Sequence, residues 1–462
     1  MNQRSRLWEM IPPWKLAGEE TTATVLLGLS GGADSGALLH LLSHFAKRDG
    51  FSVVTAHVHH GIRGEEADRD ADFCRRLAES YGWECLQLHA DVPALAAAHK
   101  RSLELEAREV RYAFFQQVMQ ERKIPILVTA HHADDNLETV LFRLCRGTGL
   151  HGLGGIPTVR KMAFGTLVRP LLPYSKSEIL DFCRQEALEY VTDSTNALGD
   201  CSRNRIRLEI VPRLEEQFAG VQGSVYRMTR TLADDQNYLE READRFWQTN
   251  ASQGGISAEI LQLAHSAIRR RVIGKMLPKT LEAVHLEAVE DLLEKGNSGS
   301  SVSLPGDWCA CLQNGRLVML PDLRRREGYD PFPCREGNTL VCDGKLMVSV
   351  KTYEKCESTS NVHNAYTSLC IIKKGFKKEG LYFRARRSGD TMLRHGVSRQ
   401  IRRLYREAGV PLAVRDALPL LCDGDSILWA PFVGFADGVA VGDGDEGDWQ
   451  IAVLIQTIEE TK

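Results

Sequence analysis

The chain of 462 residues predicts an α/β fold: a Rossmann-like parallel-sheet domain, then a small helical domain and a small α+β domain. Three observations predict this order. Apolar, strand-like runs alternate with helical patterns over roughly the first two hundred residues. Residues 213 to about 295 are rich in helix formers and contain no strand-like run, and short alternating strands with one helix follow from about residue 335. A chain of this length exceeds one compact core, so several domains are expected.

Strand-like and helix-like segments alternate along the first domain, which favours a parallel sheet with helices on both faces. Its strands are short apolar runs, and its helices repeat apolar residues every three or four positions. Folds of this class bind ligands at the carboxyl ends of the strands. We expect strands at 25–29, 52–58, 84–89 and 124–130, and helices at 37–47, 65–81, 102–121, 135–145 and 176–186.

Changes in composition predict the domain boundaries. The parallel-sheet domain is expected to span residues 1–215, a mainly helical domain residues 216–330, and the α+β domain residues 335–462. A run of three arginines and a pair of prolines before residue 335 is typical of an interdomain linker. In the last domain we expect a helix at 398–408 and strands at 427–432 and 451–455.

Charge is distributed unevenly along a chain whose net charge is only −3. Residues 373–415 contain thirteen Lys or Arg and three Asp or Glu, whereas residues 437–448 contain five acids and no base. A locally basic segment in a near-neutral protein favours a polyanionic partner. We therefore expect a polyanion to bind the last domain.

Cysteine usage and the N-terminal sequence predict the compartment. The twelve cysteines contain no Cys-x-x-Cys pair, which predicts reduced, mostly buried thiols and neither disulfides nor a zinc site. The N-terminus lacks the apolar segment of a signal peptide, and no apolar run reaches 18 residues. These features predict a cytoplasmic protein with no membrane partner.

The turn Ser30–Ser35 follows the first expected strand and leads directly into a helix. Unpaired backbone N–H groups at a helix start carry partial positive charge and bind anions. Gly31 and Gly32 allow the main chain to approach a ligand, and the two serines add hydroxyl donors. The turn lacks the Gly-Lys-Ser/Thr ending of the ordinary P-loop. It therefore predicts a phosphate site of another kind, and the alternative is a glycine-rich turn without a ligand.

A second polar segment, Thr129–Thr139, follows the fourth expected strand and opens a helix. Asp135 and Glu138 lie three residues apart, so they share a face of the first turn. Acids at a helix start also serve as caps. Two acids on one face beside His131 and His132 favour a cation-binding role over capping alone.

Three further polar groups have both a functional and a structural interpretation. The segment Val58–Gly64 follows the second strand, either as a ligand-side loop or as an ordinary turn. Arg108 and Arg111 share a helix with several glutamates, where a solvated, ion-paired face needs no function. The run Arg203–Arg207 contains three arginines, which suit a polyanion but are also common on surfaces.

Taken in order, these motifs resemble those of bacterial tRNA(Ile)-lysidine synthases. The turn Ser30–Ser35 is similar to the pyrophosphate-binding loop of the ATP pyrophosphatases, the PP-loop superfamily. Residues 383–434 resemble the family's C-terminal domain. His59 departs from the pattern, which predicts Asn or Asp there, and it is expected to alter nucleotide or lysine contacts. The other matching motifs are His57–Arg63, Leu103–Arg108 with Arg111 and Tyr112, Thr129–Gly149, Arg169–Leu172 and Asp193–Arg207.

The resemblance implies a reaction. ATP would adenylate the C2 oxygen of the wobble cytidine in a tRNA(Ile) with a CAU anticodon. The ε-amine of L-lysine would then displace AMP and leave lysidine. Adenylation converts a poor leaving group into a good one, and the loop would hold the departing pyrophosphate as its charge grows.

The resemblance also implies roles for individual residues. The implied catalytic residues are Asp34, His132, Asp135 and Glu138. Asp34 would orient the Mg²⁺ that accompanies the phosphates, so it is also the implied metal ligand. Asp135 and Glu138 would pair with the ammonium groups of lysine, and one carboxylate would accept the proton of the attacking amine. His132 would lie on the cytidine side. The implied ATP-binding residues are Ser30, Gly31, Gly32, Ala33, Asp34, Ser35, Arg111 and Arg203.

Other assignments stay open at this point. The expected partners are ATP, L-lysine and the CAU-anticodon tRNA(Ile), whose backbone the basic C-terminal domain would bind. The sequence does not decide the oligomeric state, and a homodimer is one assembly that it allows. The main alternative is a tRNA cytidine thiolase of the same superfamily, although such enzymes use the Cys-x-x-Cys motifs that this chain lacks. An amide-forming synthetase and a non-catalytic RNA-binding factor are further alternatives.

Overall fold

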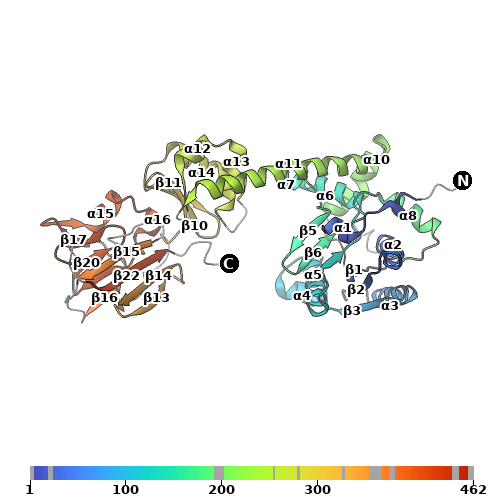
Figure 1. Ribbon diagram of the computed structural model, residues 1–462, viewed down its shortest axis with the longest axis horizontal. Helices are drawn as coiled ribbons and strands as arrows, with labels where there is room; N and C mark the ends of the chain where they lie inside the picture. Colours follow the sequence, from blue (N-terminus) through green and yellow to red (C-terminus); the bar gives the residue numbers. More distant parts are fainter. Residues whose placement is uncertain are drawn as a thin grey trace. The chain divides into compact units, whose positions relative to one another are not determined.

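The computed structural model describes residues 5–18, 24–191, 202–252, 255–277, 281–324, 328–352, 367–373, 380–439 and 447–455. The chain divides into two compact units, Met1–Asn237 and Tyr238–Lys462 (Figure 1). The boundaries expected near residues 215 and 330–335 remain predictions. No helix in the described ranges is both long enough and apolar enough to span a bilayer.

The first unit is built on a six-stranded sheet in the order β3-β2-β1-β4-β6-β5. Neighbouring strands from β3 to β6 run parallel, which confirms the predicted α/β class. The edge strand β5 is antiparallel to β6, and the sequence did not predict this hairpin. The strands are β1 (Thr24–Gly28), β2 (Ser52–His59), β3 (Glu84–His89), β4 (Ile126–Val128), β5 (Val159–Met162) and β6 (Gly165–Val168).

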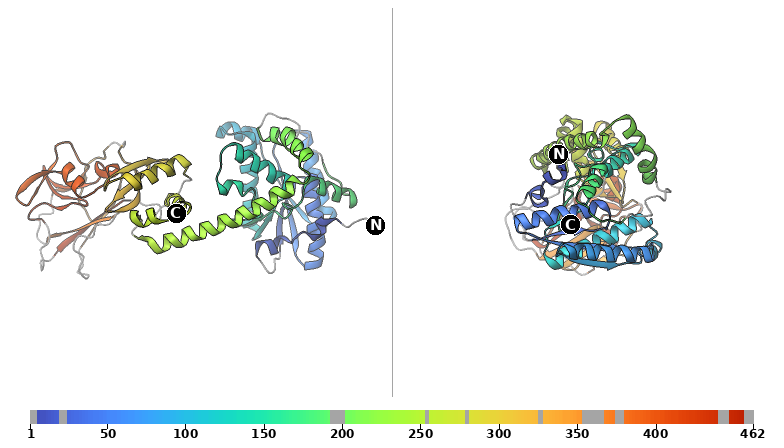
Figure 2. Two further views of the ribbon diagram at one scale, coloured as in Figure 1. Left: turned by 90° about the horizontal axis from the view of Figure 1, so that it is seen from above. Right: turned by 90° about the vertical axis from the view of Figure 1, so that its right-hand side faces the viewer.

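Helices cover both faces of this sheet because successive strand residues point to opposite sides. Val25 and Leu27 of β1 pack into one core with helices α2 and α3, whereas Leu26 packs into the other core with α5. Figure 2 shows helices on both sides of this sheet. The first-unit helices are η1 (Arg6–Glu9), α1 (Pro13–Ala17), α2 (Ala33–Asp49), α3 (Glu65–Ser80), α4 (Val92–His99), α5 (Leu103–Arg122), α6 (Ala133–Cys145), α7 (Leu150–Leu153), α8 (Lys176–Gln185), α9 (Ser202–Arg205), the π-helical turn η3 (Ile206–Ile210) and α10 (Val211–Gln217). Helix α11 (Val221–Asn250) begins in the first unit and ends in the second.

Helices α2 and α6 begin earlier than expected. Helix α2 starts at Ala33 and not at Ala37, because the small residues after Gly32 continue directly as the first helical turn. Helix α6 starts at Ala133, two residues before the predicted Asp135. As a result, Asp34 and Asp135 both lie in a first helical turn at the carboxyl edge of the sheet.

The second unit begins with helices packed on a small sheet. Its strand order is β7-β8-β11-β10-β9, so the prediction of no strand between residues 213 and 295 was wrong. Gly255 and Ile256 form a strand because they pair with β11, a long-range contact that local sequence does not reveal. The elements are β7 (Ala251–Ser252), β8 (Gly255–Ser257), α12 (Ala258–Leu263), α13 (Ser266–Lys275), α14 (Ala283–Lys295), β9 (Ser301–Leu304), β10 (Trp308–Gln313) and β11 (Arg316–Pro321).

The remainder of the second unit is mostly antiparallel sheet around a core that includes Phe383, Tyr405 and Trp429. Its helix α15 starts at Ile401, three residues later than predicted, because residues 397–400 pair as strand β18. The elements are β12 (Phe332–Pro333), β13 (Gly337–Val341), β14 (Leu346–Thr352), β15 (Thr367–Lys373), β16 (Leu381–Arg384), β17 (Thr391–Arg394), β18 (Val397–Gln400), α15 (Ile401–Glu407), α16 (Leu412–Arg415), β19 (Leu420–Asp423), β20 (Ser426–Ala430), β21 (Gly434–Phe435) and β22 (Gly447–Ile455).

Candidate active site

The loop between β1 and α2 has the geometry of an anion site. Gly31 has a φ of +83°, a conformation that favours glycine, and Gly32 is the N-cap of α2. The Ser35 hydroxyl accepts the backbone N–H of Ser30 at 3.2 Å and lies 3.0 Å from the Ser30 hydroxyl. These contacts fix the loop so that the amides at the start of a 17-residue helix stay available to a ligand.

A cavity of about 350 Å³ adjoins this loop at the carboxyl ends of β1, β2 and β4. Ser30, Asp34 and Ser35 reach it from the loop, and Asp135 reaches it from α6. The position agrees with the general rule for ligand sites on parallel sheets. The other polar residues that line it are His57, His60, Arg63, Arg108, Arg111, Tyr112, Thr129 and His131.

Helix α5 contributes positive charge to the cavity through Arg108 and Arg111. Desolvation by the surrounding protein, and then the neighbouring Arg108, lower the pKa of Arg111. Glu106 of the same helix is buried and contacts His99 and Arg101. Arginines at a cavity wall suit a phosphate ligand.

Three histidines at the carboxyl end of β2 point to two different sides. His57 lines the cavity and hydrogen-bonds the carbonyl of Leu29 through Nδ1 at 2.9 Å. His60 also lines the cavity, and burial followed by Arg111 lowers its pKa to about 4. His59 instead points toward α3, so its departure from the family pattern does not face the cavity.

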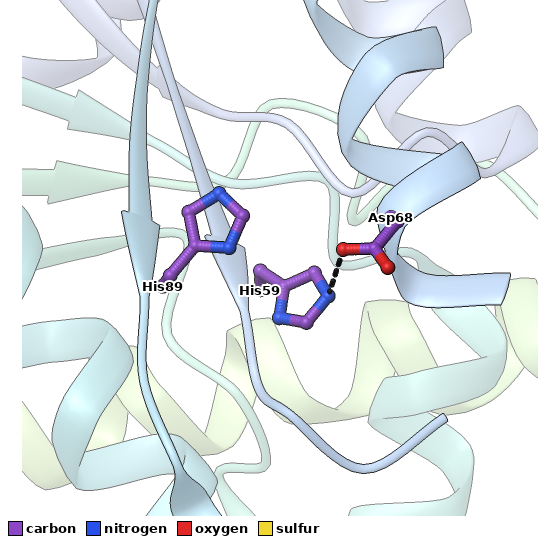
Figure 3. A group of neighbouring side chains, drawn as sticks. All are labelled: His59, Asp68 and His89. Atoms are coloured by element: carbon purple, nitrogen blue, oxygen red, sulfur yellow. Dashed lines mark ion pairs between the residues drawn. The ribbon is translucent and has the colours of Figure 1, made fainter. Parts of the chain in front are cut away.

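His59 forms a small cluster with Asp68 and His89 (Figure 3). His59 Nδ1 accepts the backbone N–H of Gly61 at 3.3 Å, which assigns the ring proton to Nε2, 3.2 Å from Asp68 Oδ1. The His89 ring stacks on His59 with centroids 4.7 Å apart. A metal ion on Nε2 would require the opposite tautomer, which the Gly61 contact disfavours. The mutual contacts of the three side chains account for their positions without an ion.

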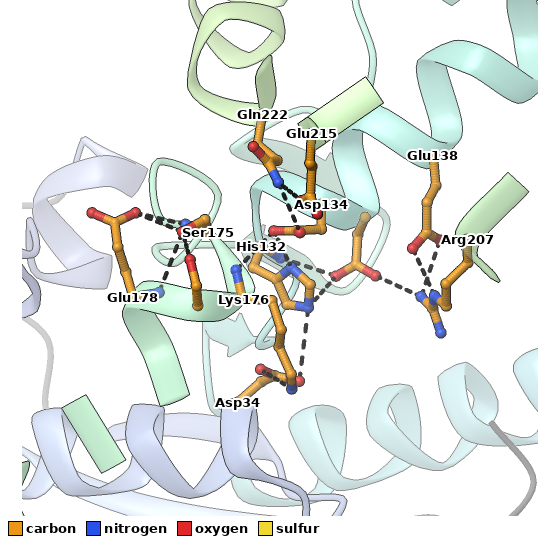
Figure 4. A network of polar contacts seen from close by, with 12 residues as sticks. Asp34, His132, Asp134, Glu138, Ser175, Lys176, Glu178, Arg207, Glu215 and Gln222 are labelled. Carbon is orange, nitrogen blue, oxygen red and sulfur yellow. Dashed lines mark hydrogen bonds and ion pairs between the residues drawn. The ribbon is translucent and has the colours of Figure 1, made fainter. Parts of the chain in front are cut away.

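Carboxylates and cations from several elements meet at the start of α6 (Figure 4). Lys176 Nζ at the start of α8 lies 2.6 Å from Asp34 Oδ1, and His132 Nε2 lies 3.8 Å from Asp34 Oδ2. The backbone N–H of Lys176 donates to Asp134 Oδ2 at 2.7 Å. This network joins the phosphate loop to α6 and α8.

Asp135 acts both as a cap and as an ion-pair partner. Its Oδ2 accepts the backbone N–H of His132 at 3.0 Å, whereas its Oδ1 lies 3.2 Å from Arg207 Nη2. Arg207 also holds Glu138, with Nε 2.6 Å from Oε1 and Nη2 3.0 Å from Oε2. Asp135 and Glu138 therefore converge on one cation, as their shared face predicted. The sequence left open whether the run Arg203–Arg207 binds a polyanion or is an ordinary surface run, and the guanidinium of Arg207 contacts these two acids.

The carboxylates also set the protonation of the two histidines. Burial opposes charge on His132, but Asp134, Asp135 and Asp34 outweigh it and raise the pKa of His132. Burial likewise opposes the charged form of Asp135, but the charge of His132 lowers its pKa. For His131 the neighbouring charges do not offset burial, which lowers its pKa to about 4. The site thus favours a cationic His132 next to a neutral His131.

A second cavity, of about 880 Å³, lies beside the same helix start. Asp134 and Lys176 line it together with Glu215, Gln222 and Arg227. Because Lys176 contacts Asp34, which lines the first cavity, this ion pair lies between the two.

Sequence reasoning missed Lys176 and did not foresee the inward position of Arg207. Lys176 follows Ser175, whose side chain caps α8, and this ordinary helix start carries no local signal of a charged partner on α2. The predicted ATP-binding residue Arg203 has no described side chain, and the preceding motif residues 193–201 lie outside the described residues.

Comparison with known proteins extends these observations. Residues 6–214 match the PP-loop domain family, and residues 381–452 match the TilS substrate C-terminal domain. A tRNA(Ile)-lysidine synthase from Shouchella clausii is 30% identical over 447 residues, which cover 92% of this chain and 93% of that protein. The chain belongs to the tRNA(Ile)-lysidine synthase family.

Other lysidine synthases are similar over the same extent. The enzymes of that name from Clostridium tetani and Bacillus subtilis are each 28% identical, over 88% of this chain and 89% of their own length. The solved U34-tRNA thiolase of Methanococcus maripaludis is 25% identical and covers 46% of this chain and 72% of its own, with a TM-score of 0.40. The predicted membership of the lysidine synthase family is confirmed.

Proposed function

We propose that this protein ligates L-lysine to C2 of the wobble cytidine in CAU-anticodon tRNA(Ile), through an adenylated cytidine, with release of AMP and pyrophosphate. The observation that carries this proposal is membership of the tRNA(Ile)-lysidine synthase family over nine-tenths of the chain. Both the PP-loop domain and the C-terminal domain take part in that match.

The first half-reaction needs a site for the triphosphate of ATP. The loop Ser30–Ser35 supplies backbone amides at a helix start, and Arg108 and Arg111 supply charge across the cavity. The cytidine C2 oxygen attacks the α-phosphorus, and the bond to pyrophosphate breaks. Donors aimed at the departing pyrophosphate lower the barrier, because its negative charge grows in the transition state.

Mg²⁺ is the proposed metal cofactor, and Asp34 is its proposed ligand. Hard cations take oxygen ligands, and Asp34 is a carboxylate in the first turn after the phosphate loop. When bound, Mg²⁺ would neutralise part of the charge on the pyrophosphate. Lys176 Nζ, 2.6 Å from Asp34, supplies a second positive charge at the same place.

The second half-reaction needs a site for the lysine ammonium groups. Four carboxylates, those of Asp34, Asp134, Asp135 and Glu138, face three cations: the permanently charged Lys176 and Arg207, and His132. This excess of negative charge favours a cationic ligand. The lysine ε-amine attacks C2, and AMP leaves with the electron pair of the C2–O bond. The carboxylate of Asp135 or Glu138 accepts the proton that the amine loses.

The basic C-terminal segment is the proposed contact with the tRNA backbone. Arg399, Arg402, Arg403 and Arg406 are exposed on β18 and α15. Phosphate contacts of this kind give affinity that falls with salt, and specificity would come from bases of the anticodon loop. The homodimer and the cytoplasmic location remain predictions.

The thiolase alternative has less support. Three similar sequences that span most of this chain are named tRNA(Ile)-lysidine synthases, and the full sequence contains no Cys-x-x-Cys motif.

Incubation of the purified protein with ATP, radiolabelled lysine and transcribed CAU-anticodon tRNA(Ile) tests the proposal. We expect label in the tRNA and release of both AMP and pyrophosphate. A tRNA(Ile) transcript with another wobble base is the matched control and should stay unlabelled. Absence of label in the cognate tRNA, or formation of ADP in place of AMP, would overturn the proposal.

A further inference from the structure

An arginine of the chain itself covers the carboxylates to which substrate lysine is assigned. Arg207 Nε and Nη2 lie 2.6 Å and 3.0 Å from the two oxygens of Glu138, and Nη2 lies 3.2 Å from Asp135 Oδ1 (Figure 4). The other Asp135 oxygen accepts the backbone N–H of His132. Each of the four carboxylate oxygens therefore already faces a donor.

The three side chains of this contact differ in their exposure to solvent. The Glu138 side chain is 3% exposed and that of Asp135 is 16% exposed, whereas that of Arg207 is 38% exposed. Arg207 is thus the most exposed of the three side chains, and Glu138 is the most buried.

The guanidinium of Arg207 can compete with the ammonium of lysine for these carboxylates. A guanidinium that binds a carboxylate with two parallel N–H groups pairs more strongly than a primary ammonium, which is a point charge. Arg207 is also held by the chain at a high effective concentration, whereas lysine arrives from solution. A lysine ammonium that takes these oxygens must displace the guanidinium.

We propose that Arg207 competes with the ε-ammonium of substrate lysine for Asp135 and Glu138, and turns aside when lysine binds. This inference rests on the proposed function, since it takes lysine as the substrate of these acids. Arg207 belongs to the π-helical turn η3, a type of irregular turn that is frequent at functional sites. Its side chain is partly exposed and is therefore not enclosed by the protein on all sides. Arg207 therefore sets how much lysine the enzyme needs.

The variant Arg207→Gln tests this competition, because it removes the charge and keeps a side chain of similar reach. If Arg207 turns aside in about a tenth of free molecules, its removal lowers the KM for lysine about tenfold. The variant Arg207→Lys replaces the two-pronged guanidinium by an ammonium, which pairs more weakly with the carboxylates. Its lysine KM should therefore lie between those of the wild type and Arg207→Gln. Arg213→Gln, at an exposed arginine on α10, is the matched control and should keep the wild-type lysine KM.

A purely structural role for Arg207 predicts the opposite result. Loss of a partner that only orients the acids would raise the lysine KM, because the carboxylates would be misplaced. Thermal unfolding adds a second readout: added lysine should raise the Tm of Arg207→Gln more than that of the wild type, since it replaces the missing cation. A lysine KM that is unchanged or higher in Arg207→Gln overturns the inference. Failure of the wild-type protein to incorporate lysine overturns the proposed function instead.

Discussion

Lys176 Nζ lies 2.6 Å from Asp34 Oδ1, although 142 residues separate the two in the sequence. The phosphate loop has no lysine of its own, unlike the ordinary P-loop. Helix α8 supplies that missing charge from a distant part of the chain. This ion pair links the loop that should bind ATP to the acidic start of α6.

Replacement of Lys176 by Ala should weaken ATP use. A lost hydrogen bond to a charged group is worth about 1.5–3 kcal/mol, so the KM for ATP in pyrophosphate release should rise roughly 10- to 100-fold. Lys176→Arg keeps the charge, so its KM for ATP should lie close to the wild-type value. The assignment fails if Lys176→Ala leaves the KM for ATP at the wild-type value.

Replacement of Glu138 by Gln should affect lysine and spare ATP. Its buried carboxylate is the deeper partner of the proposed cation site, so we expect the KM for lysine to rise about 10- to 100-fold. ATP–pyrophosphate exchange in the presence of tRNA should change much less. Glu216→Gln, at an exposed glutamate on α10, is the control. Equal loss of both activities would contradict the lysine assignment.

Replacement of Gly31 by Ala should disturb the phosphate loop itself. Its φ of +83° costs an L-residue about 1–2 kcal/mol, and a Cβ there would lie 3.1 Å from Cys74 Sγ. Gly50→Ala is a matched control, since Gly50 has a φ of +75° in open space away from the loop. Both variants should have a lower Tm, but only Gly31→Ala should raise the KM for ATP. A similar KM for ATP in both variants would argue against phosphate binding by this loop.

His60 should stay neutral well below neutral pH. Burial, and then the nearby Arg111, lower the pKa of His60 from 6.5 to about 4. The unfolded chain takes up this proton near pH 6.5 and the folded chain only near pH 4, so His60 makes the folded state less stable as the pH falls through that window. NMR of histidine-labelled protein should show one resonance, absent in His60→Gln, with a midpoint near 4. A midpoint near 6.5 would contradict this environment.

Neutralisation of Arg402 should weaken tRNA binding in a salt-dependent way. Each phosphate contact contributes about 0.7–0.9 to the slope of log affinity against log salt concentration, so Arg402→Ala should reduce that slope by about this amount. Arg403→Ala should have a smaller effect, because Arg403 Nε already donates to Glu407 Oε1 at 2.7 Å. Binding to transcribed tRNA over a range of salt concentrations measures both slopes. An unchanged slope for Arg402→Ala would exclude this surface.

Local sequence was sufficient for much of the first unit. The strand at 84–89 has the predicted limits and helix α8 starts at the predicted Lys176, because periodicity and capping residues act over only a few neighbours. The same local patterns located the loop Ser30–Ser35 and the shared face of Asp135 and Glu138. Strands β5 and β8 escaped prediction because each is short and forms only by pairing with a partner strand.

The sequence by itself determined the order of strands, phosphate loop and helices, and with them the family, since each motif is a short contiguous segment. Only the tertiary structure decided which charges meet. Lys176 reaches Asp34 and Arg207 reaches Glu138 across 142 and 69 residues. The reason is physical: local propensity sets the backbone of each helix, but packing on the sheet decides which charged side chains come within ion-pair distance. Partial burial then makes their attraction stronger than it would be in water.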